Sequence, residues 1–280
     1  MENNGAPITN TKTTNYDSNP VTNAVSGLVI VLKNNPVTIL LLPILYYFAL
    51  TMVVSSLAIF ILIGAIAKSP IIIALLVIIS IVILGLVIAL FTASFFMTAV
   101  KSAKNEKTEV GDVLRISFKR LLPYWGLTIL YGLAIFFGLL LFIIPGIIIA
   151  GRGSLASLVF FEENLGPVDS LKRSFALTKG HVIEMLGTSA ASALLNGGGM
   201  GLLIGATSVG PYLGRYKDLT ALQASGAVKP KIHWMNYLIV FGGILYVILS
   251  IIYVVAAVAL DSSSTSSTTT TLISQIKHLV

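Results

Sequence analysis

The fold is decided by residues 139–181, LLLFIIPGIIIAGRGSLASLVFFEENLGPVDSLKRSFALTKGH. This stretch holds an apolar run, the step Pro145-Gly146, a second apolar run and a short basic segment that ends at Gly180. Two apolar runs separated by a Pro-Gly step predict a hairpin of membrane helices, with Pro145 and Gly146 at the hairpin turn. The basic segment carries Asp169 in its first turn and Lys179 in its last, which predicts a short amphipathic helix.

A second copy of this arrangement lies 57 residues earlier. Residues 112–118, DVLRISF, and residues 169–175, DSLKRSF, share the pattern Asp-x-Leu-basic-x-Ser-Phe. In both copies a helix breaker followed by a ring comes five residues after the Phe, as Pro123-Tyr124 and as Gly180-His181. A weaker third copy near residues 21–36 keeps only the amphipathic segment and a breaker. We therefore predict three repeats, each an amphipathic helix followed by a hairpin of two spans.

The composition places this 280-residue chain in a membrane. Hydrophobic residues make up 56% and charged residues only 10%, against the roughly 25% charged residues of soluble domains. Several apolar runs exceed the length of about 20 residues that crosses a bilayer, and none alternates with the period of a strand. We predict an all-α polytopic membrane helix bundle with about six transmembrane helices. The absence of Cys excludes disulfides and thiol nucleophiles.

The element boundaries follow from the apolar runs and their breakers. Transmembrane helices are expected at residues 37–67, 71–100, 124–144, 147–161, 182–209 and 235–260. Interfacial amphipathic helices are expected at residues 21–33, 108–122 and 167–179. One membrane domain, 21–260, then lies between a disordered N-terminal tail, 1–20, and a Ser/Thr-rich C-terminal tail, 261–280.

Small residues in the later spans predict close helix packing, because small side chains let helix backbones approach in lipid. The predicted packing positions are Gly153 and Ser157 in the fourth span and Gly197, Gly201 and Gly205 in the fifth. The glycine run at 197–199 also allows a break with a re-entrant turn. We prefer a continuous fifth helix, because the four-residue spacing is kept on both sides of that run.

Basic residues predict the orientation. With a continuous fifth span, twelve Lys and Arg residues lie on the side of the amphipathic helices and five on the other. The positive-inside rule then places the amphipathic helices and both termini in the cytoplasm, below the inner or plasma membrane. The basic segment 211–233 fits this arrangement poorly, because it becomes an extracytoplasmic loop. A re-entrant fifth segment would bring that loop inside and send the C-terminus out.

A resemblance to a known family rests on Ile144-Pro145-Gly146-Ile147, Arg152, Glu162, Gly166-Pro167-Val168, 171–175 and 178–181. They resemble the membrane domain of glycerophosphoryl diester phosphodiesterases and related uncharacterised six-helix bacterial inner-membrane proteins. The resemblance covers roughly residues 110–219 and implies the fold and the membrane location. In those phosphodiesterases the catalytic part is a separate soluble barrel, for which this sequence has no counterpart, so the resemblance implies no activity.

Arg152 is the strongest candidate for a functional contact. It follows the predicted turn by about 8 Å of helix, and a charge near the bilayer centre costs on the order of 3 kcal/mol. A lipid phosphate or anionic solute in an internal cavity could compensate it, or the side chain could pair with backbone carbonyls or snorkel toward the turn. We favour the latter, structural interpretation. Lys172 and Arg173 are the other candidate lipid or solute contacts. His181 and Glu184 have a metal-ligand spacing without a second set, so capping is expected there.

No catalytic, metal or cofactor constellation is predicted, so we do not expect an enzyme. The expected function is that of a non-catalytic integral membrane protein that organises or senses lipid and envelope components. Its expected partners are anionic lipid headgroups rather than nucleic acid, because basic residues in so apolar a chain meet the membrane surface. The alternative is a transporter or permease component for a small solute or lipid, which Arg152, Asn196 and the glycines could serve.

Overall fold

The computed structural model describes residues 19–66, 69–197, 204–226, 231–245, 248–250, 252–253 and 255–257. Within these residues the chain is helical and contains no strand, so the all-α prediction is confirmed. Both predicted tails lie almost entirely outside the described residues. Among the described residues, five helices are long and apolar enough to cross a membrane: Pro36–Gly64, Pro70–Ala103, Leu121–Leu141, Ile143–Glu162 and Trp234–Ala257.

The helices α1 to α10 follow one another as three units, each with an amphipathic helix and a hairpin. The first unit contains α1 (Pro20–Asn34), α2 (Pro36–Ile66) and α3 (Pro70–Ala103). The second unit contains α4 (Val110–Lys119), α5 (Leu121–Leu141), α6 (Ile143–Gly153) and α7 (Ala156–Glu162). The third unit contains α8 (Pro167–Leu177), α9 (Val182–Gly197) and α10 (Ile204–Ser225). Helices α4 and α8 begin 57 residues apart, which is the spacing of the sequence repeat.

Each hairpin ends in the same backbone conformation. Asn105 follows α3 with φ 59°, Asn164 follows α7 with φ 55°, and Gly226 follows α10 with φ 62°. Asn and Gly adopt this left-handed conformation most readily, and it commonly terminates a helix. The second arm of each hairpin is therefore followed by a residue with the same left-handed φ.

Prolines determine where four of the helices begin. Pro20, Pro36, Pro70 and Pro167 are the first residues of α1, α2, α3 and α8. Proline suits this position because backbone N–H groups in the first turn have no acceptor within the helix, so the N–H that proline lacks costs no hydrogen bond. At α1 the side-chain oxygen of Asn19 also accepts a hydrogen bond from the Val21 backbone N–H, at 2.9 Å.

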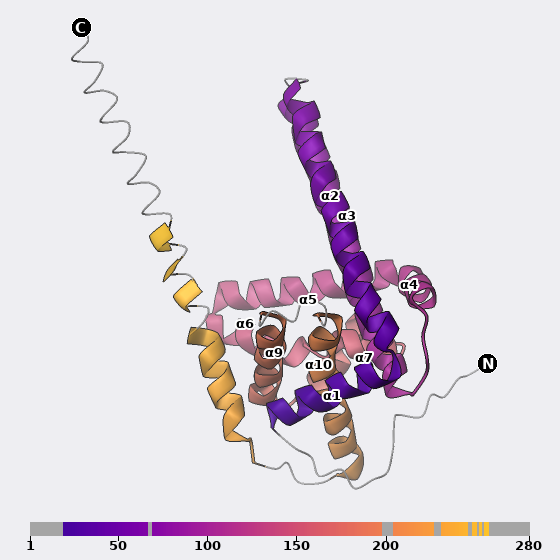
Figure 1. Ribbon diagram of the computed structural model, residues 1–280. Helices are drawn as coiled ribbons and strands as arrows, with labels where there is room; N and C mark the ends of the chain where they lie inside the picture. The colour runs from indigo at the N-terminus through magenta and orange to yellow at the C-terminus, as the bar shows by residue number, and fades with distance from the viewer. Residues whose placement is uncertain are drawn as a thin grey trace.

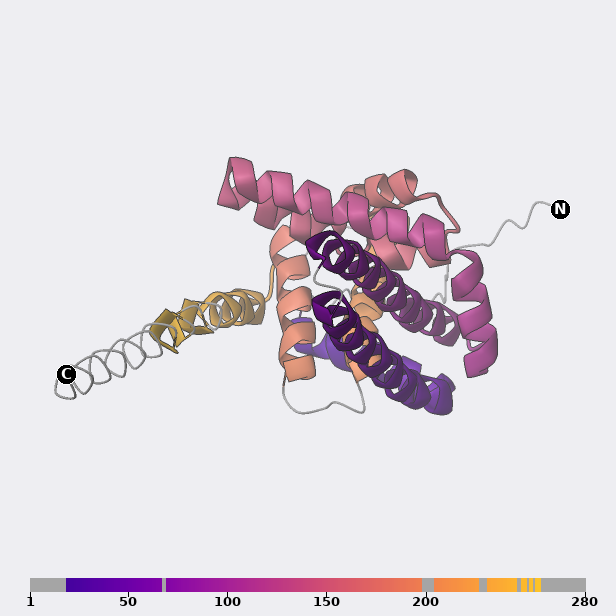
Figure 2. The ribbon, with the colours of Figure 1, turned by 90° about the horizontal axis from the view of Figure 1, so that it is seen from above.

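The α2–α3 hairpin projects away from the remaining helices, and α5 runs across its direction (Figures 1 and 2). The projecting part of the α2–α3 hairpin contacts no other helix in these views, and its apolar side chains face outward. Among them, Phe48, Met52 and Ile78 are between 55% and 62% exposed. The opposite end of the hairpin is packed, with Ala99 and Val100 buried. Outward apolar side chains on helices of this length are what a lipid environment requires.

The second hairpin turns at a different residue from the predicted one. Helix α5 ends at Leu141, Phe142 is extended, and Pro145 and Gly146 lie in the first turns of α6. The prediction of a hairpin turn at Pro145-Gly146 is therefore wrong. Proline is also common in the first turn of a helix, and that is where Pro145 lies. Gly146 instead lets the arms approach: a Cβ added there would lie 2.5 Å from the Leu139 side chain.

The fourth span contains the predicted packing residues, although a turn at Ser154 and Leu155 divides it into α6 and α7. A Cβ added to Gly153 would lie 2.3 Å from the ring of Tyr131 on α5. Ser157 Oγ accepts a hydrogen bond from the Tyr124 hydroxyl at 3.1 Å. Both small residues thus face α5, and at Gly153 a larger side chain would clash with it.

The predicted continuous span 182–209 is wrong. Helices α9 and α10 form an antiparallel pair, in which Ser192 Oγ donates to the Thr207 carbonyl at 3.0 Å and Arg215 Nε donates to Thr188 Oγ1 at 3.4 Å. The third hairpin is thus α9–α10, and the segment 211–233, predicted as a loop, is helical up to Ser225. The Thr207 carbonyl lacks its usual helical donor, because that donor position is Pro211.

The glycine spacing in this region therefore does not form one seam. Gly197 ends α9, Gly201 lies outside the described residues, and Gly205 belongs to the next helix. Gly205 does pack closely, because a Cβ there would lie 2.7 Å from the Phe95 ring. Of the three predicted positions, Gly205 thus packs closely, and it does so against α3; the surroundings of Gly197 and Gly201 lie outside what the structure describes.

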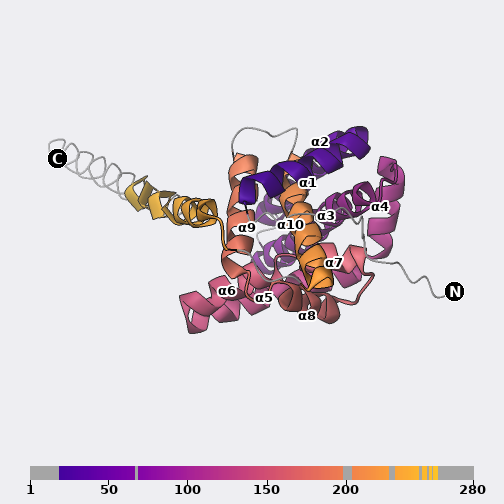
Figure 3. The same cartoon turned by 90° about the horizontal axis from the view of Figure 1, so that it is seen from below.

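The closest helix crossing joins α1 to α10 (Figures 1 and 3). A Cβ added to Gly27 would lie 1.8 Å from the Gly210 carbonyl oxygen, and one added to Gly214 would lie 2.2 Å from the Asn23 carbonyl oxygen. Glycine is needed on both sides for backbones to meet in this way. Helix α1 is thus a packed helix of the bundle; its predicted apolar residues Val21 and Val25 remain exposed on the other face.

Candidate functional site: the junction of the three units

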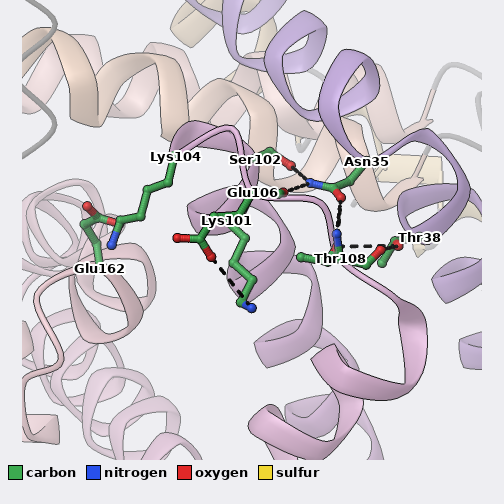
Figure 4. A network of polar contacts seen from close by, with 8 residues as sticks. All are labelled: Asn35, Thr38, Lys101, Ser102, Lys104, Glu106, Thr108 and Glu162. Atoms are coloured by element: carbon green, nitrogen blue, oxygen red, sulfur yellow. Dashed lines mark hydrogen bonds and ion pairs between the residues drawn. The ribbon is translucent and has the colours of Figure 1, made fainter.

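The first unit is closed by Asn35, the residue between α1 and α2 (Figure 4). Its amide nitrogen donates to Ser102 Oγ at 2.8 Å and to the Glu106 carbonyl at 2.9 Å. Its amide oxygen accepts from the backbone N–H of Thr108 at 2.7 Å and from the hydroxyl of Thr108 at 3.0 Å. All four hydrogen-bonding positions of this buried side chain are used, which ties the start of the hairpin to its exit.

Arg120 occupies the equivalent joint of the second unit, between α4 and α5. Its guanidinium donates to the carbonyls of Phe160 at 3.1 Å and of Leu165 at 3.0 Å, and it lies 4.0 Å from the centre of the Phe160 ring. Burial lowers the pKa of Arg120 from its usual value. Arg120 therefore contacts the end of its own hairpin, as Asn35 does in the first unit. The first two units share this contact as well as the order of their helices.

The exits of the first and second hairpins meet through an ion pair. Lys104 Nζ lies 3.4 Å from Glu162 Oε2, and the Glu162 side chain is only 7% exposed (Figure 4). Lys217 of α10 also approaches this carboxylate; burial lowers the pKa of Lys217, and the charge of Glu162 partly opposes that shift. The carboxylate therefore lies among residues from all three units.

Arg173 joins the second unit to the third. Its Nε lies 3.0 Å from both carboxylate oxygens of Glu163, and its Nη1 donates to Gln223 Oε1 at 3.2 Å. The Tyr216 hydroxyl donates to Glu163 Oε1 at 3.2 Å, and burial raises the pKa of Tyr216, as do the neighbouring carboxylates Glu163 and Glu162. Arg173, a predicted lipid contact, is thus engaged within the protein, with about a third of its side chain exposed.

Arg152, the foremost sequence candidate, connects α6 to α8. Its Nη2 donates to the Phe175 carbonyl at 2.7 Å, and its guanidinium carbon lies 5.2 Å from the centre of the Phe175 ring. The backbone carbonyl of Arg152 in turn accepts from Ser174 Oγ at 2.7 Å and from Thr178 Oγ1 at 3.0 Å. This geometry agrees with the expectation that backbone carbonyls compensate the charge. The guanidinium keeps one buried nitrogen, Nε, without a hydrogen bond.

A second group of ionisable side chains is buried at the third hairpin. His181 Nδ1 pairs with Glu184 Oε2, and the residues are 7% and 0% exposed. Arg215 of α10 is also fully buried and contacts Thr188, one helical turn beyond Glu184. From the sequence, His181 and Glu184 are expected as capping residues and Arg215 is expected in a loop. The α9–α10 hairpin instead places all three along the same pair of helices. No group of three or more His, Cys, Asp or Glu side chains that could hold a metal ion occurs among the residues described here.

The outer faces of α4 and α8 carry basic and apolar side chains together. On α4, Arg115 and Lys119 are exposed beside Phe118, which is 67% exposed, and Leu122 at the start of α5 is 71% exposed. On α8, Val168 and Lys172 are exposed, and Lys179 is exposed just after the helix ends. Each helix also exposes one acidic residue, Asp112 or Asp169. The exposed Arg115 and Lys172 occupy matching positions of the repeat, as do the buried Ser117 and Ser174. The two helices therefore share an exposed cation and a buried serine at matching positions, whereas their other exposed residues differ.

Comparison with protein-family models, with curated proteins and with solved structures finds no match to this chain. The class follows from the fold: the chain is a helical membrane protein whose described bundle consists of three units of one plan. The charged residues at its centre are held by ion pairs or by backbone carbonyls within the protein, and α4 and α8 expose cations and apolar side chains.

Proposed function

We propose that this protein is a non-catalytic integral membrane protein that binds anionic phospholipid and organises or senses the lipid around it. The observation that carries the proposal is that α4 and α8 both expose cations next to apolar side chains: Arg115 and Lys119 with Phe118, and Lys172 with Val168. Such faces lie in the headgroup region, with the apolar side chains inserted. Each Lys or Arg near an anionic surface contributes about 1 kcal/mol of binding free energy.

We propose that this basic surface faces the cytoplasm, under the inner or plasma membrane. The reversal between α9 and α10 supports this orientation, because it returns Arg215, Lys217 and Lys231 to the side of the amphipathic helices. Only Lys68 and Lys277 then lie opposite, which agrees better with the positive-inside rule than a continuous fifth span does. The C-terminus, beyond the last span, would then be extracytoplasmic.

The resemblance to the membrane domain of glycerophosphoryl diester phosphodiesterases remains part of this proposal. The residues that carry it include Arg152 and the basic helix α8, and these two are in direct contact. A membrane domain that holds lipid at its cytoplasmic face is compatible with that resemblance and requires no chemistry of its own.

The proposal is tested by measuring which lipids stay with the purified protein. A variant with Arg115→Gln, Lys119→Gln, Lys172→Gln and Lys179→Gln should retain several-fold less anionic phospholipid after detergent extraction, measured by lipid mass spectrometry. Neutral phospholipid should be retained equally. Lys68→Gln, between α2 and α3, is the control for loss of a charge and should change nothing. Equal retention of anionic lipid by the fourfold variant would contradict the proposal.

One observation supports a transporter or permease component as the second candidate. Ionisable residues buried in a membrane domain often mark ion or proton pathways, and the third hairpin buries His181, Glu184 and Arg215. Proteoliposomes loaded with a pH-sensitive dye would report proton movement under a potential. Movement abolished by Glu184→Gln would favour this candidate over the first.

A further inference from the structure

A cavity of about 190 Å³ lies between the first and third hairpins. It is lined by Tyr46 of α2, by Thr92, Phe95 and Phe96 of α3, and by Ser208 and Val209 of α10. Three of the lining residues are apolar and buried, whereas the three that carry hydroxyl groups keep partial exposure. None of the six carries a charge, so a charged headgroup or ionic solute would be left uncompensated inside the cavity.

The cavity lies where α10 ceases to accompany the α2–α3 hairpin. Helix α10 begins at Ile204, one turn before Ser208, and beyond this level the hairpin projects alone (Figure 1). Further along α2, Phe48 and Met52 are exposed apolar residues, at 62% and 55%. In a membrane these side chains contact hydrocarbon, so the partly exposed rim of the cavity borders lipid tails.

The size of the cavity limits what it can hold. Pockets for drug-sized ligands occupy roughly 300–1,000 Å³, which is larger than this one. A space of about 190 Å³ with aromatic walls suits a single flexible hydrocarbon chain. The hydroxyls of Tyr46 and Thr92 are donors that an ester carbonyl can accept from.

We propose that this cavity binds one acyl chain of a membrane phospholipid, which enters from the surrounding bilayer. The chain would lie between α2, α3 and α10 and would fill the space next to the close contact of Gly205 with Phe95. Occupancy would thereby stabilise the packing of the first hairpin against the third. This site requires neither an anionic headgroup nor the basic helices, so it stands apart from the surface binding proposed above.

The test uses the full-length protein in nanodiscs of neutral phosphatidylcholine that contain a phospholipid with a photoreactive diazirine on one acyl chain. After illumination, proteolysis and mass spectrometry locate the crosslinks. Crosslinks to α2 and α3 are expected for any lipid-facing hairpin, so the informative peptide is the one from α10 that contains Ser208 and Val209. We expect this peptide to be crosslinked in the wild-type protein.

Thr92→Phe, which fills the cavity, should remove the α10 crosslink. Ile88→Phe, one turn earlier on the same helix at a position already 41% exposed, should leave it unchanged. If Thr92→Phe does not yield a folded protein, the smaller substitution Thr92→Leu should lower the crosslink yield. An α10 peptide without a crosslink in the wild type, or a crosslink that survives filling of the cavity, would overturn the proposal. Because the lipid is neutral, either result leaves the anionic-surface proposal untouched.

Discussion

Gly27→Ala should destabilise the protein by disrupting the crossing of α1 and α10. The added Cβ would lie 1.8 Å from the Gly210 carbonyl oxygen and 2.9 Å from the Gly214 nitrogen. Both are backbone atoms, which cannot rotate away, and real Cβ contacts essentially never fall below 3.0 Å. The two helices must therefore separate by more than 1 Å, and other contacts along the crossing must open with them.

The magnitude follows from two opposing effects. Overpacking a close contact costs typically 1–3 kcal/mol, and rigid backbone on the far side favours the upper part of that range. Replacing a helical glycine by alanine returns about 1 kcal/mol of helix propensity. The expected net loss is about 2 kcal/mol of unfolding free energy.

Urea unfolding in detergent micelles, followed by Trp fluorescence, measures this loss. The matched control is Gly132→Ala in α5, where an added Cβ meets nothing within 4 Å. That variant should be as stable as the wild type or up to about 1 kcal/mol more stable, from propensity alone. If Gly27→Ala behaves like Gly132→Ala, the close backbone crossing does not exist in solution and the placement of α1 is wrong.

Three further predictions follow from the polar contacts. Asn35→Ala removes four hydrogen bonds and should lower the unfolding free energy by about 2–4 kcal/mol, whereas Thr51→Ala, which loses one exposed bond, should stay within about 0.5 kcal/mol. A double-mutant cycle with Arg173→Gln and Glu163→Gln should give a coupling of about 1 kcal/mol that shrinks with added salt; zero coupling would refute the pair. Because burial lowers the pKa of Lys217, stability should rise with pH as it approaches the unfolded value of 10.5, and Lys217→Met should flatten that rise in pH-dependent melting.

The candidate site was only partly predictable. The basic faces of α4 and α8 could be found from periodicity, because i, i+3 and i+4 spacing defines a helix surface without knowledge of its neighbours. The expectation that carbonyls hold Arg152 agrees with the structure, since an isolated charge between apolar runs needs nearby oxygen atoms. The junction of Lys104, Glu162, Glu163 and Arg173 could not be predicted, because its partners belong to different units and meet only when the hairpins pack.

The sequence by itself determined the all-α class, the amphipathic helices α4 and α8 and the repeat spacing of 57 residues, because each depends on local periodicity and composition. Tertiary structure decided the direction of the chain after α9. A glycine run within an apolar segment permits both a continuous helix and a turn, since glycine is conformationally permissive. The turn prevails here because it pairs α9 with α10, gives the Thr207 carbonyl a donor in Ser192 and lets Gly210 and Gly214 meet α1, contacts that no local pattern encodes.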